Sequence, residues 1–491
     1  MMQEYKLFIN GEWVESSSGE MFDDINPATL ELIGKIHKAN EEDVKNAVDA
    51  AEDAFDTWSS TPAPRRAKIL FRAARMLEDR KEELSRLMTM EMGKVLKEAR
   101  GDVQEAIDMA YYAAGEGRRL LGETTPSELA DKFCMTVRRP IGVVGLITPW
   151  NFPIAIPAWK VMPALIAGNT LIFKPASDTP ILSIELVKIL QEAGLPGGVL
   201  NLVTGEGKTV GSQIVHNRKI RAVSFTGSLE TGKWILGEAA RDMKKVSLEL
   251  GGKNPIIVMD DADLDLAIDG IVWGAFGTTG QRCTAASRVI AHYKILPELL
   301  KKLIERTKKL KTGNGLLENT DVGPVINNSQ LQKIAKYVDI GKKEGAKLVL
   351  GGNIIKPLPG YFFEPTIFTD VSPDMRIAQE EIFGPVVSLI KAQDIDDAIH
   401  IANSVEYGLS SSIYSANLKN AFKAIEKIEA GITYINASTI GAEIHLPFGG
   451  IKSTGNGTRE AGTTAIEEFT ELKTVYFDYS GKLQKAQIDI E

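Results

Sequence analysis

The segment from Asn169 to Leu190, NTLIFKPASDTPILSIELVKIL, determines the predicted fold. Residues 170–174 form a short apolar run, a turn with proline and serine follows, and residues 180–190 have apolar side chains at helical spacing. The alternation continues with apolar runs at residues 198–205, 222–228, 246–252 and 254–259. Short strands between helices predict an α/β fold with a mostly parallel sheet covered on both faces.

The sequence on either side of this segment predicts more helices and a second α/β domain. Residues 42–58 carry an apolar helical stripe, and helical patterning continues to about residue 118, with breaks near Pro62, Pro64 and Gly93. Asp263 is a suitable N-cap for a helix that leads to residues 277–283. Residues 283–450 then repeat the alternation of strands and helices.

The length and composition are typical of a soluble protein with several domains. A chain of 491 residues is too long for one ordinary core, and 44% hydrophobic with 25% charged residues is the balance of a globular protein. The net charge of −8 is spread along the sequence, which disfavours nucleic acid and anionic membranes as partners. No apolar stretch has the length of a membrane span, and the first residues lack a secretory signal.

The cysteines and histidines limit the chemistry further. Two cysteines cannot build a disulfide framework in a chain of this size, so we expect a reducing, cytoplasmic location. The five histidines are isolated from one another and show no metal-ligand spacing, so we expect no metal site.

Cys283 lies in the turn GTTGQRCTAASR, residues 277–288, after Gly280 and Arg282. A cysteine nucleophile needs surroundings that favour its thiolate, and a turn at an element boundary beside an arginine is a suitable place. Turn cysteines also occur as packing residues, and the motif alone favours that structural interpretation. Cys134, in an alternating strand-like run, is expected to be a packing residue.

Two polar residues end apolar runs where ligands bind in such sheets. Glu249 closes the run VSLE before two glycines, and burial there would raise its pKa into the range of a general base. The alternative is an outward-facing residue on a half-exposed strand, which its alternation with Ser247 allows. Asn151, in TPWNFP at residues 148–153, is either an oxyanion donor or an ordinary turn asparagine.

Glycine-rich turns and one lysine are candidates for an anionic ligand. GEGKTVG, residues 205–211, resembles a phosphate loop through Gly207 and Gly211 but lacks the strict spacing. FTGSLETG, residues 225–232, follows a strand and opens a helix, so it is either an anion site or a tight turn and cap. Lys174 reaches either a ribose or phosphate, or extends along the surface as an ordinary lysine.

Seven motifs in this order carry a resemblance to a known family. They are TPWNFP, AGNTLIFKPAS, FTGS, LELGGKNP, GQRC, EEIFGPV and PFGGIKSTGNGTREAG. Over essentially its whole length the chain resembles the NAD(P)-dependent aldehyde dehydrogenase superfamily. The resemblance implies a Rossmann-type cofactor domain, an α/β catalytic domain and a small β oligomerisation arm.

The resemblance assigns Cys283 as the nucleophile, Glu249 as the base that activates water, and Asn151 as an oxyanion donor with the Cys283 backbone N–H. It implies that Lys174 and Glu381 bind the two riboses of the dinucleotide and that Phe383 lies at the nicotinamide end. The other residues that it places in the cofactor site are Thr148, Pro149, Trp150, Ser177, Gly207, Gly211, Phe225, Thr226, Gly227, Ser228, Leu250 and Gly251.

The implied reaction is oxidation of an aldehyde to a carboxylic acid through a thiohemiacetal and a thioester on Cys283. Members that pass the acyl group to coenzyme A lack a glutamate at the Glu249 position, so hydrolysis is expected here. The competing hypothesis is a thiol hydrolase or acyltransferase that uses Cys283 and Glu249 without a redox step. A non-catalytic scaffold would be expected to have lost one of these two residues, and both are present.

The sequence says less about which dinucleotide and which aldehyde are used than about the reaction. Members strict for NAD often have a glutamate at the position of Ser177, so the small serine predicts that NADP is tolerated beside NAD and leaves a preference for NADP open. Phe152, Trp159 and Phe448 match residues of the aldehyde tunnel. Arg282 either recognises a carboxylate or phosphate of the aldehyde or pairs with an acidic neighbour. GAEIHLPFGG, residues 441–450, looks closest to branches that oxidise semialdehydes, such as those of α-ketoglutarate or succinate.

The family's three parts divide this chain as follows. Residues 1–118 and 141–250 are assigned to the dinucleotide-binding domain and residues 251–465 to the catalytic domain. Residues 119–140 and 466–491 are assigned to the oligomerisation arm. Open sheet edges favour a homodimer, or a tetramer of two dimers, with a small-molecule aldehyde as the other partner.

Overall fold

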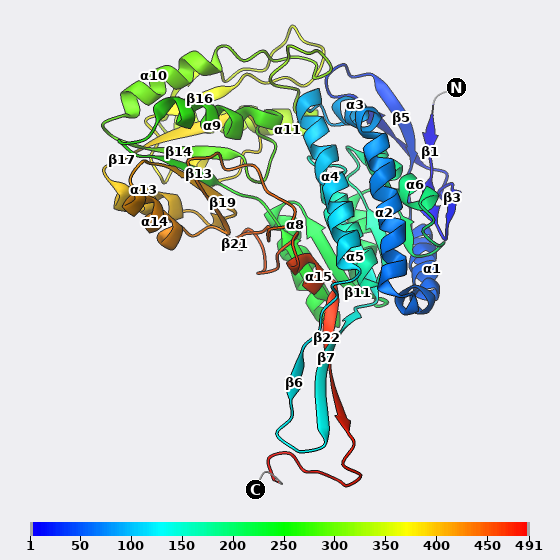
Figure 1. The fold of residues 1–491 in the computed structure, drawn as a ribbon. Helices are drawn as coiled ribbons and strands as arrows, with labels where there is room; N and C mark the ends of the chain where they lie inside the picture. Colours follow the sequence, from blue (N-terminus) through cyan, green and yellow to red (C-terminus); the bar gives the residue numbers. More distant parts are fainter. Residues whose placement is uncertain (1–2, 489–491) are drawn as a thin grey trace.

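The computed structural model describes residues 3–488, and these residues form two lobes and a long arm that projects from the first lobe (Figure 1). The first lobe contains a seven-stranded sheet of order β12-β11-β8-β9-β10-β2-β3. Its strands are β2 (Leu7–Ile9), β3 (Glu12–Val14), β8 (Val143–Ile147), β9 (Thr170–Lys174), β10 (Leu200–Leu202), β11 (Ile220–Thr226) and β12 (Lys245–Glu249). The five strands from β8 to β12 are parallel, as predicted, and β2 and β3 continue the sheet antiparallel.

Helices cover both faces of this sheet. They are α1 (Glu41–Ser60), α2 (Ala63–Asp79), α3 (Lys81–Glu91), α4 (Leu96–Glu116), α5 (Ala155–Ala167), α6 (Pro180–Glu192), α7 (Ser212–His216) and α8 (Leu229–Ala239). Val144 and Phe173 belong to one apolar cluster, whereas Val143 and Ile172 belong to another. Successive strand residues point to opposite faces, so the continuous apolar runs supply both cores.

The second lobe has its own seven-stranded sheet, of order β15-β16-β17-β14-β13-β19-β20. The strands are β13 (Asn254–Val258), β14 (Ala286–His292), β15 (Lys347–Leu350), β16 (Thr366–Thr369), β17 (Val386–Ala392), β19 (Ser410–Tyr414) and β20 (Ile432–Ile435). Its helices are α9 (Leu264–Phe276), α10 (Leu296–Thr307), α11 (Asn328–Lys343), α12 (Arg376–Gln379), α13 (Ile395–Asn403) and α14 (Leu418–Lys427). Only β15 is antiparallel to its neighbour, so the predicted second α/β domain is confirmed.

Two short sheets and the arm complete the described residues. One sheet joins β1 (Glu4–Tyr5), β5 (Leu32–His37) and β4 (Met21–Ile25), and another joins β18 (Tyr407–Gly408) and β21 (Ile451–Lys452). The arm consists of β6 (Thr124–Pro126), β7 (Lys132–Pro140) and β22 (Thr470–Asp478), in the order β22-β7-β6. The strand-like tail therefore pairs within its own chain, antiparallel to β7. Residues 489–491, which were assigned to the arm, lie outside the described residues.

One boundary differs from the sequence-based division. The catalytic domain was expected to extend to residue 465, but Ala461 and Ile466 pack in the apolar cluster of the first lobe, and α15 (Thr464–Glu468) lies against α5. The chain thus returns from the second lobe to the first before it enters the arm. This return brings the residues around Glu460 next to the first sheet.

Helix α9 delivers the chain to the predicted nucleophile. Asp263 caps it as expected, accepting hydrogen bonds from the backbone N–H groups of Asp265 and Leu266. After Phe276 the chain makes a tight turn in which Thr278 and Thr279 have φ values of 51° and 59°. These left-handed conformations end the helix abruptly and direct Cys283 back toward the first lobe.

No helix between residues 3 and 488 has the length and apolarity of a membrane span. In the same residues, no three His, Cys, Asp or Glu side chains come together in a way that could hold a metal ion.

Candidate active site

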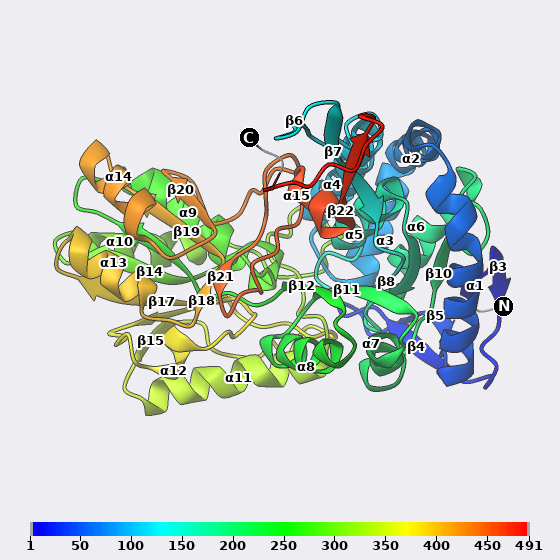
Figure 2. The same cartoon turned by 90° about the horizontal axis from the view of Figure 1, so that it is seen from below.

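The predicted site residues gather where the carboxyl ends of the first sheet face the second lobe (Figures 1 and 2). A cavity of about 180 Å³ lies there. It is lined by the predicted residues Pro149, Trp150, Asn151, Thr226, Gly227, Ser228, Leu250, Gly251, Cys283, Glu381 and Phe383, and also by Ile156, Gln330 and Lys333. This position beyond the strand ends is the usual ligand site of a parallel α/β sheet.

A second cavity lies on the other side of Cys283. All four residues predicted for the aldehyde tunnel line it, namely Phe152, Trp159, Arg282 and Phe448. Glu249, Glu460 and Glu105 line it as well. Cys283 belongs to the lining of both cavities, so its sulfur lies where the two meet.

Cys283 is a free, half-buried thiol. Burial and the nearby carboxyl of Glu249 raise its pKa to about 12. These surroundings favour the neutral thiol of Cys283 over the thiolate. A neighbouring base must take its proton before it can attack a carbonyl carbon. The loop itself is fixed because the Cys283 carbonyl accepts a hydrogen bond from Asn254 Nδ2 at 2.8 Å.

Glu249 ends β12 and is buried, so the alternative of an outward-facing residue is wrong. Among the described residues, neither of its carboxylate oxygens has a hydrogen-bond partner. Burial, and then the Glu460 carboxyl, raise its pKa well above the usual value. Space for this side chain depends on Gly449, because a Cβ at that position would lie 2.5 Å from Glu249 Oε1. A buried, unpaired carboxyl with a raised pKa has the properties of a general base.

Asn151 is buried in the loop after β8. Its Nδ2 donates a hydrogen bond to the carbonyl oxygen of Gln281 at 3.1 Å, two residues before Cys283. This bond uses one N–H of the amide and leaves the second available at the nucleophile loop. Asn151 is therefore held in place beside Cys283, as an oxyanion donor must be.

A buried ionic cluster behind Glu249 was not predicted from the sequence. The Nζ of Lys160, on α5, contacts the Glu460 carboxylate and donates a hydrogen bond to Ser224 Oγ at 2.8 Å. Ser224 Oγ in turn donates to Glu468 at 2.8 Å, and burial raises the pKa of Glu468 to about 7. A lysine in the apolar helix AIPAWKVMPALIA is a visible signal, but Glu460 is 300 residues away in the sequence.

A second buried ion pair supports the tunnel wall. Lys94 and Asp102 form a 2.5 Å contact with both side chains fully buried, and the Lys94 ammonium lies 3.4 Å from the centroid of the Phe152 ring. Arg282 Nε donates to Thr278 Oγ1 at 2.9 Å, and the guanidinium lies 3.6 Å from Glu98. Arg282 thus pairs with an acidic neighbour, as one of the two interpretations expected, and it also lines the tunnel, where recognition of a substrate carboxylate stays a prediction.

The residues on the other side of Cys283 fit a dinucleotide. The Lys174 ammonium is buried with the Pro175 carbonyl as a partner at 3.0 Å, and burial lowers its pKa to about 8, so it retains N–H groups for ligand hydroxyls. Glu381 accepts a hydrogen bond from the Gly252 N–H at 2.9 Å. A Cβ at Gly251 would lie 2.5 Å from the Glu381 carboxylate, so glycine is needed there. Glu381 lines the cavity, whereas Lys174 is not part of its lining, and both retain polar atoms that suit the hydroxyl groups of a sugar.

Aromatic side chains flank this cavity. The rings of Trp150 and Phe383 meet edge to face, with centroids 5.4 Å apart. Phe383 has a φ of 59°, a strained value for a bulky residue that directs its ring at the cavity. Gly227 precedes α8, and Ser228 caps this helix through the Thr231 N–H. An exposed helix N-terminus next to the cavity is suited to a pyrophosphate.

Several predicted cofactor residues lie outside the cavity lining. Thr148 and Ser177 follow β8 and β9, and Ser177 Oγ donates to the Gly205 carbonyl at 2.9 Å. Gly207 has open space around it, whereas a Cβ at Gly211 would contact Lys174 at 3.8 Å. Phe225 requires a correction, because its ring is buried in the core under Gly227 and does not line the cavity.

Comparison with known proteins agrees with this geometry. The model of the aldehyde dehydrogenase family matches residues 13–475. The chain belongs to the aldehyde dehydrogenase family. The alpha-ketoglutaric semialdehyde dehydrogenase of Bacillus subtilis is 45% identical over 96% of this chain and 98% of its own length. The alpha-ketoglutarate semialdehyde dehydrogenase of Haloferax volcanii is also 45% identical, over 96% and 99% of the two chains.

Solved structures of family members confirm the fold. The betaine aldehyde dehydrogenase of Staphylococcus aureus, crystallised with NAD+, superimposes with a TM-score of 0.95 at 37% identity and covers 98% of this chain and 96% of the crystallised one. Membership of this family assigns oxidation of an aldehyde to the acid and disfavours a thiol hydrolase or acyltransferase without a redox step.

Proposed function

We propose that this aldehyde dehydrogenase oxidises a carboxylated semialdehyde with NAD+ or NADP+, using Cys283 as nucleophile and Glu249 as base. The observation that carries the proposal is the position of Cys283 at the junction of two cavities. One cavity has features that fit a dinucleotide, and the other is an aromatic tunnel that contains an arginine.

The first half of the reaction begins with the removal of a proton from Cys283. Glu249 lines the same tunnel and has two unpartnered oxygens, so it is the group that accepts this proton. The sulfur then attacks the aldehyde carbon, and Asn151 with the Cys283 backbone N–H stabilises the oxyanion. The bound dinucleotide supplies the acceptor for the hydride that leaves the aldehyde carbon. Cys283 retains the acyl group as a thioester.

The second half is hydrolysis. Glu249 first passes the thiol proton to the buried cluster behind it, and it then takes a proton from water as the oxygen attacks the thioester carbon. The Cys283 sulfur leaves and the carboxylic acid is released. Glu249 must then lose its proton before the next cycle. The buried carboxyl of Glu468, which has a pKa of about 7, is joined to Glu460 through Ser224 and Lys160, lies behind Glu249 and is suited to receive a proton.

The semialdehyde proposal combines the tunnel with the relatives. The enzymes from Bacillus subtilis and Haloferax volcanii are named for α-ketoglutarate semialdehyde, which carries a carboxylate at the end distant from the aldehyde. Arg282 lines the tunnel, and its contacts with Thr278 and Glu98 leave part of its N–H fork available. A guanidinium with free donors is the side chain that best recognises a carboxylate.

Ser177 supports the use of NADP as well as NAD. Its hydroxyl donates to the Gly205 carbonyl, which joins the loops after β9 and β10, and it adds no negative charge near Lys174. An acidic side chain at this position would repel a 2′-phosphate, whereas a serine does not. We expect both dinucleotides to support turnover, with efficiencies that do not differ by orders of magnitude. The two free cysteines are consistent with a cytoplasmic location.

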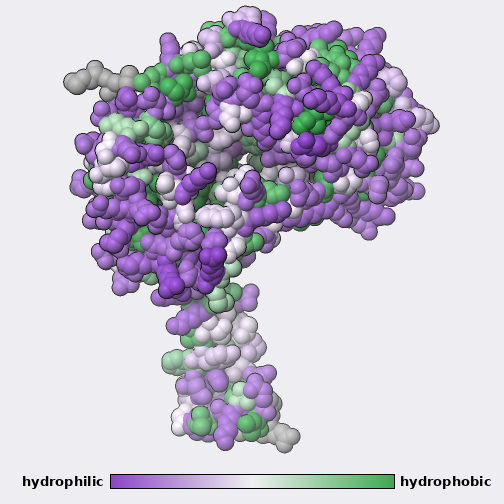
Figure 3. All heavy atoms as spheres, turned by 180° about the vertical axis from the view of Figure 1, so that it is seen from behind, coloured by the Kyte–Doolittle hydropathy of each residue, from purple (hydrophilic) through white to green (hydrophobic). Residues whose placement is uncertain are grey.

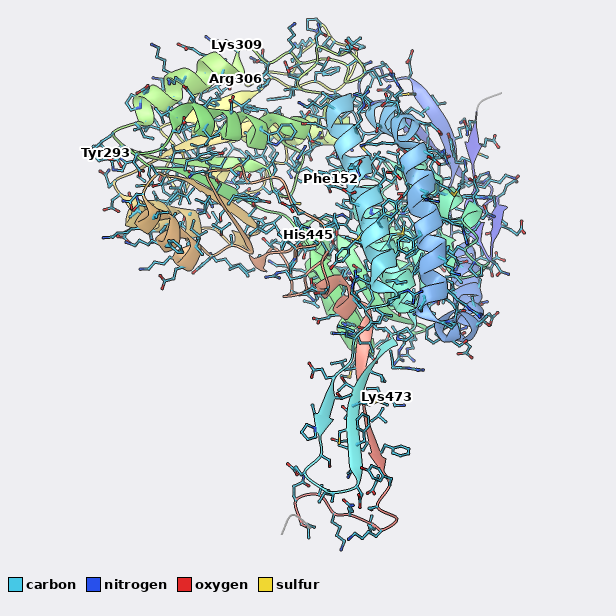
Figure 4. The ribbon with its side chains drawn as sticks, in the orientation of Figure 1. Phe152, Tyr293, Arg306, Lys309, His445 and Lys473 are labelled. Carbon is cyan, nitrogen blue, oxygen red and sulfur yellow. The ribbon has the colours of Figure 1, made fainter. Side chains whose placement is uncertain are left out.

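The arm is proposed to join subunits into a dimer or a tetramer. It projects from the body, and apolar side chains are visible on it (Figure 3). The exposed large apolar residues of the described part of the arm are Leu121, Phe133, Leu472, Tyr476, Phe477, Tyr479, Leu483 and Ile488. Truncation after Lys473, which lies along the arm (Figure 4), should reduce the mass measured by light scattering to that of a smaller assembly. An unchanged mass would contradict this role.

The central experiment measures initial rates of dinucleotide reduction with aliphatic, aromatic, hydroxy and carboxylated aldehydes and with both dinucleotides. Cys283→Ser should reduce oxidation of every aldehyde by a factor of at least about 10³, because an alcohol is a much weaker nucleophile than a thiolate. Dinucleotide affinity, measured by fluorescence quenching, should stay near the wild-type value. Substantial oxidation by Cys283→Ser would refute the assigned nucleophile.

A further inference from the structure

Glu105 on α4 lines the aldehyde tunnel together with Arg282 and Phe152. Phe152 lies on the side of α4 that faces the space between the lobes (Figure 4). Between residues 3 and 488, Glu105 has no ion-pair or hydrogen-bond partner, although the carboxylates of its neighbours Glu98 and Asp102 are both engaged. A carboxyl group that faces a cavity without a partner is available to a ligand.

The residues that line the tunnel have either apolar or polar side chains. Its large apolar side chains are Phe152, Ile156, Trp159, Leu250, Ile440 and Phe448. Of its polar side chains, Glu249, Glu460 and Cys283 belong to the reacting centre already described, and Thr226 and Thr284 are small and uncharged. Glu105 and Arg282 therefore remain as the strongly polar groups that can bind the distant end of a substrate.

The charged surroundings of Glu105 favour its neutral form. Burial is the largest cause that raises its pKa, to about 7, and the carboxylates of Asp102 and Asp108 add to it, while Lys94 and Arg282 oppose it. On β20, Tyr434 is close enough for Glu105 to contribute to the raised pKa of its phenol. Below about pH 7 the carboxyl thus mostly carries a proton that it can donate in a hydrogen bond, and above this pH it is mostly ionised.

We propose that Glu105 is a specificity-determining residue that forms, with Arg282, a two-point receptor for the carboxylate of the aldehyde substrate. The protonated carboxyl of Glu105 donates a hydrogen bond to one carboxylate oxygen, and the Arg282 guanidinium pairs with the other. This inference rests on the proposed oxidation of a carboxylated aldehyde. It adds Glu105, which lies on α4 and is far in sequence from Cys283, to the residues that select the substrate.

The receptor makes substrate preference depend on pH. As the pH rises through the pKa of Glu105, its carboxyl ionises, loses the donor and repels the substrate carboxylate. The KM for a carboxylated aldehyde should therefore rise, whereas an uncharged aldehyde is not subject to this repulsion. The ratio of the two kcat/KM values isolates the effect, because ionisation of Cys283 and Glu249 affects both substrates equally.

The test measures kcat/KM for succinate semialdehyde and for butanal from about pH 6 to about pH 9 in the wild type and in Glu105→Gln, Glu105→Leu and Asp108→Asn. In the wild type the preference for succinate semialdehyde should fall about tenfold over this range, because a hydrogen bond to a charged group is lost. Glu105→Gln keeps an N–H donor that does not titrate, so its preference should not vary with pH. Glu105→Leu should lower the preference about tenfold at the acidic end. Asp108→Asn removes an exposed charge that adds to the raised pKa of Glu105, so it should keep the preference for succinate semialdehyde and shift its fall to a slightly lower pH.

Three results would overturn the inference. In the first, the preference of Glu105→Gln for succinate semialdehyde changes with pH as in the wild type. In the second, the preference of Glu105→Leu equals that of the wild type. In the third, the wild type prefers an aldehyde with an amino group, and Glu105→Gln abolishes that preference. Glu105→Gln is nearly isosteric, so a folding defect in the leucine variant does not remove the test. If the wild type oxidises butanal without these ratio changes, only this inference fails, whereas the lack of any aldehyde oxidation would reject the proposed function itself.

Discussion

Two buried lysines lie on either side of the aldehyde tunnel, and their surroundings differ in charge. Lys160 faces Glu460, with Glu468 and Glu249 nearby, so carboxyl groups outnumber the ammonium. Lys94 pairs with Asp102, and the nearby guanidinium of Arg282 adds a second positive charge. The first cluster has an excess of acids, whereas the second is close to neutral when Glu98 is included.

This difference in charge suits the Lys160 cluster to proton transfer and the Lys94 cluster to structural support. Excess carboxyls in a buried site cannot all ionise, so the Lys160 cluster retains protons near neutral pH and can exchange them with Glu249. The Lys94 cluster has fixed partners, since Asp102 also accepts a hydrogen bond from the Ala155 N–H at the start of α5. Changes in the first cluster should alter rates and pH profiles, and changes in the second should alter stability.

The largest expected effect is that of Glu249→Gln. The amide cannot accept a proton from water, so steady-state turnover should fall by a factor of about 10² to 10⁴. The first burst of the reduced dinucleotide in stopped-flow absorbance should be slowed as well, because Glu249 is also proposed to take the thiol proton before the thioester forms. Steady-state turnover close to that of the wild type would exclude Glu249 as the base for hydrolysis.

The pH dependence follows from the same residue. Glu249 has a raised pKa, so at low pH it is protonated and cannot act as a base. The wild-type rate should therefore increase with pH through the pKa of Glu249, and Glu249→Gln should lack this increase.

The next effect is expected from Asp102→Ala in the Lys94 cluster. It leaves a buried ammonium without its partner and frees the Ala155 N–H, so the free energy of unfolding should fall by about 3–5 kcal/mol. Denaturant unfolding followed by fluorescence measures this change. Asp108→Ala, an exposed change on the same helix, provides the control and should cost much less. Equal losses for the two variants would contradict the supporting role of the pair.

The smallest effect is expected from Glu468→Gln in the Lys160 cluster. The wild-type carboxyl has a pKa of about 7, so it adds a negative charge near Glu249 at alkaline pH. Removing that charge should shift the rise of the hydrolysis rate to lower pH, by about one unit or less, with a change in maximal turnover of a few-fold. The matched control is Glu467→Gln, whose exposed carboxylate contacts Arg138. A pH profile identical to that of the wild type would show that the charge of Glu468 does not affect Glu249.

The two α/β lobes could be predicted from the sequence, because buried strands between helices have a local pattern of apolar residues. Val143 and Val144 illustrate this, since an apolar pair at successive strand positions is needed only when both faces are covered. Family motifs identified the residues that line the two cavities, including Cys283, Glu249 and Asn151. Their individual roles remain predictions that the variants above address.

Other features depend on contacts that no local pattern encodes. Lys160 and Glu460 are 300 residues apart, and their pairing arises only because the chain returns to the first lobe near residue 460. Glu105 lies on a helix with several acids, and its orientation toward the tunnel depends on packing between the lobes. Phe225 precedes a motif glycine, yet strand alternation turns its ring into the core.

Because Cys283 lines two adjoining cavities, the molecule offers two places for inhibitors. A compound that fills the aromatic tunnel need not displace one that occupies the space beside Trp150 and Phe383. Fragments found separately for the two spaces can be joined across Cys283 into a single ligand, which would gain affinity because the second contact becomes intramolecular. Such a ligand would combine features of both reactants in one compound.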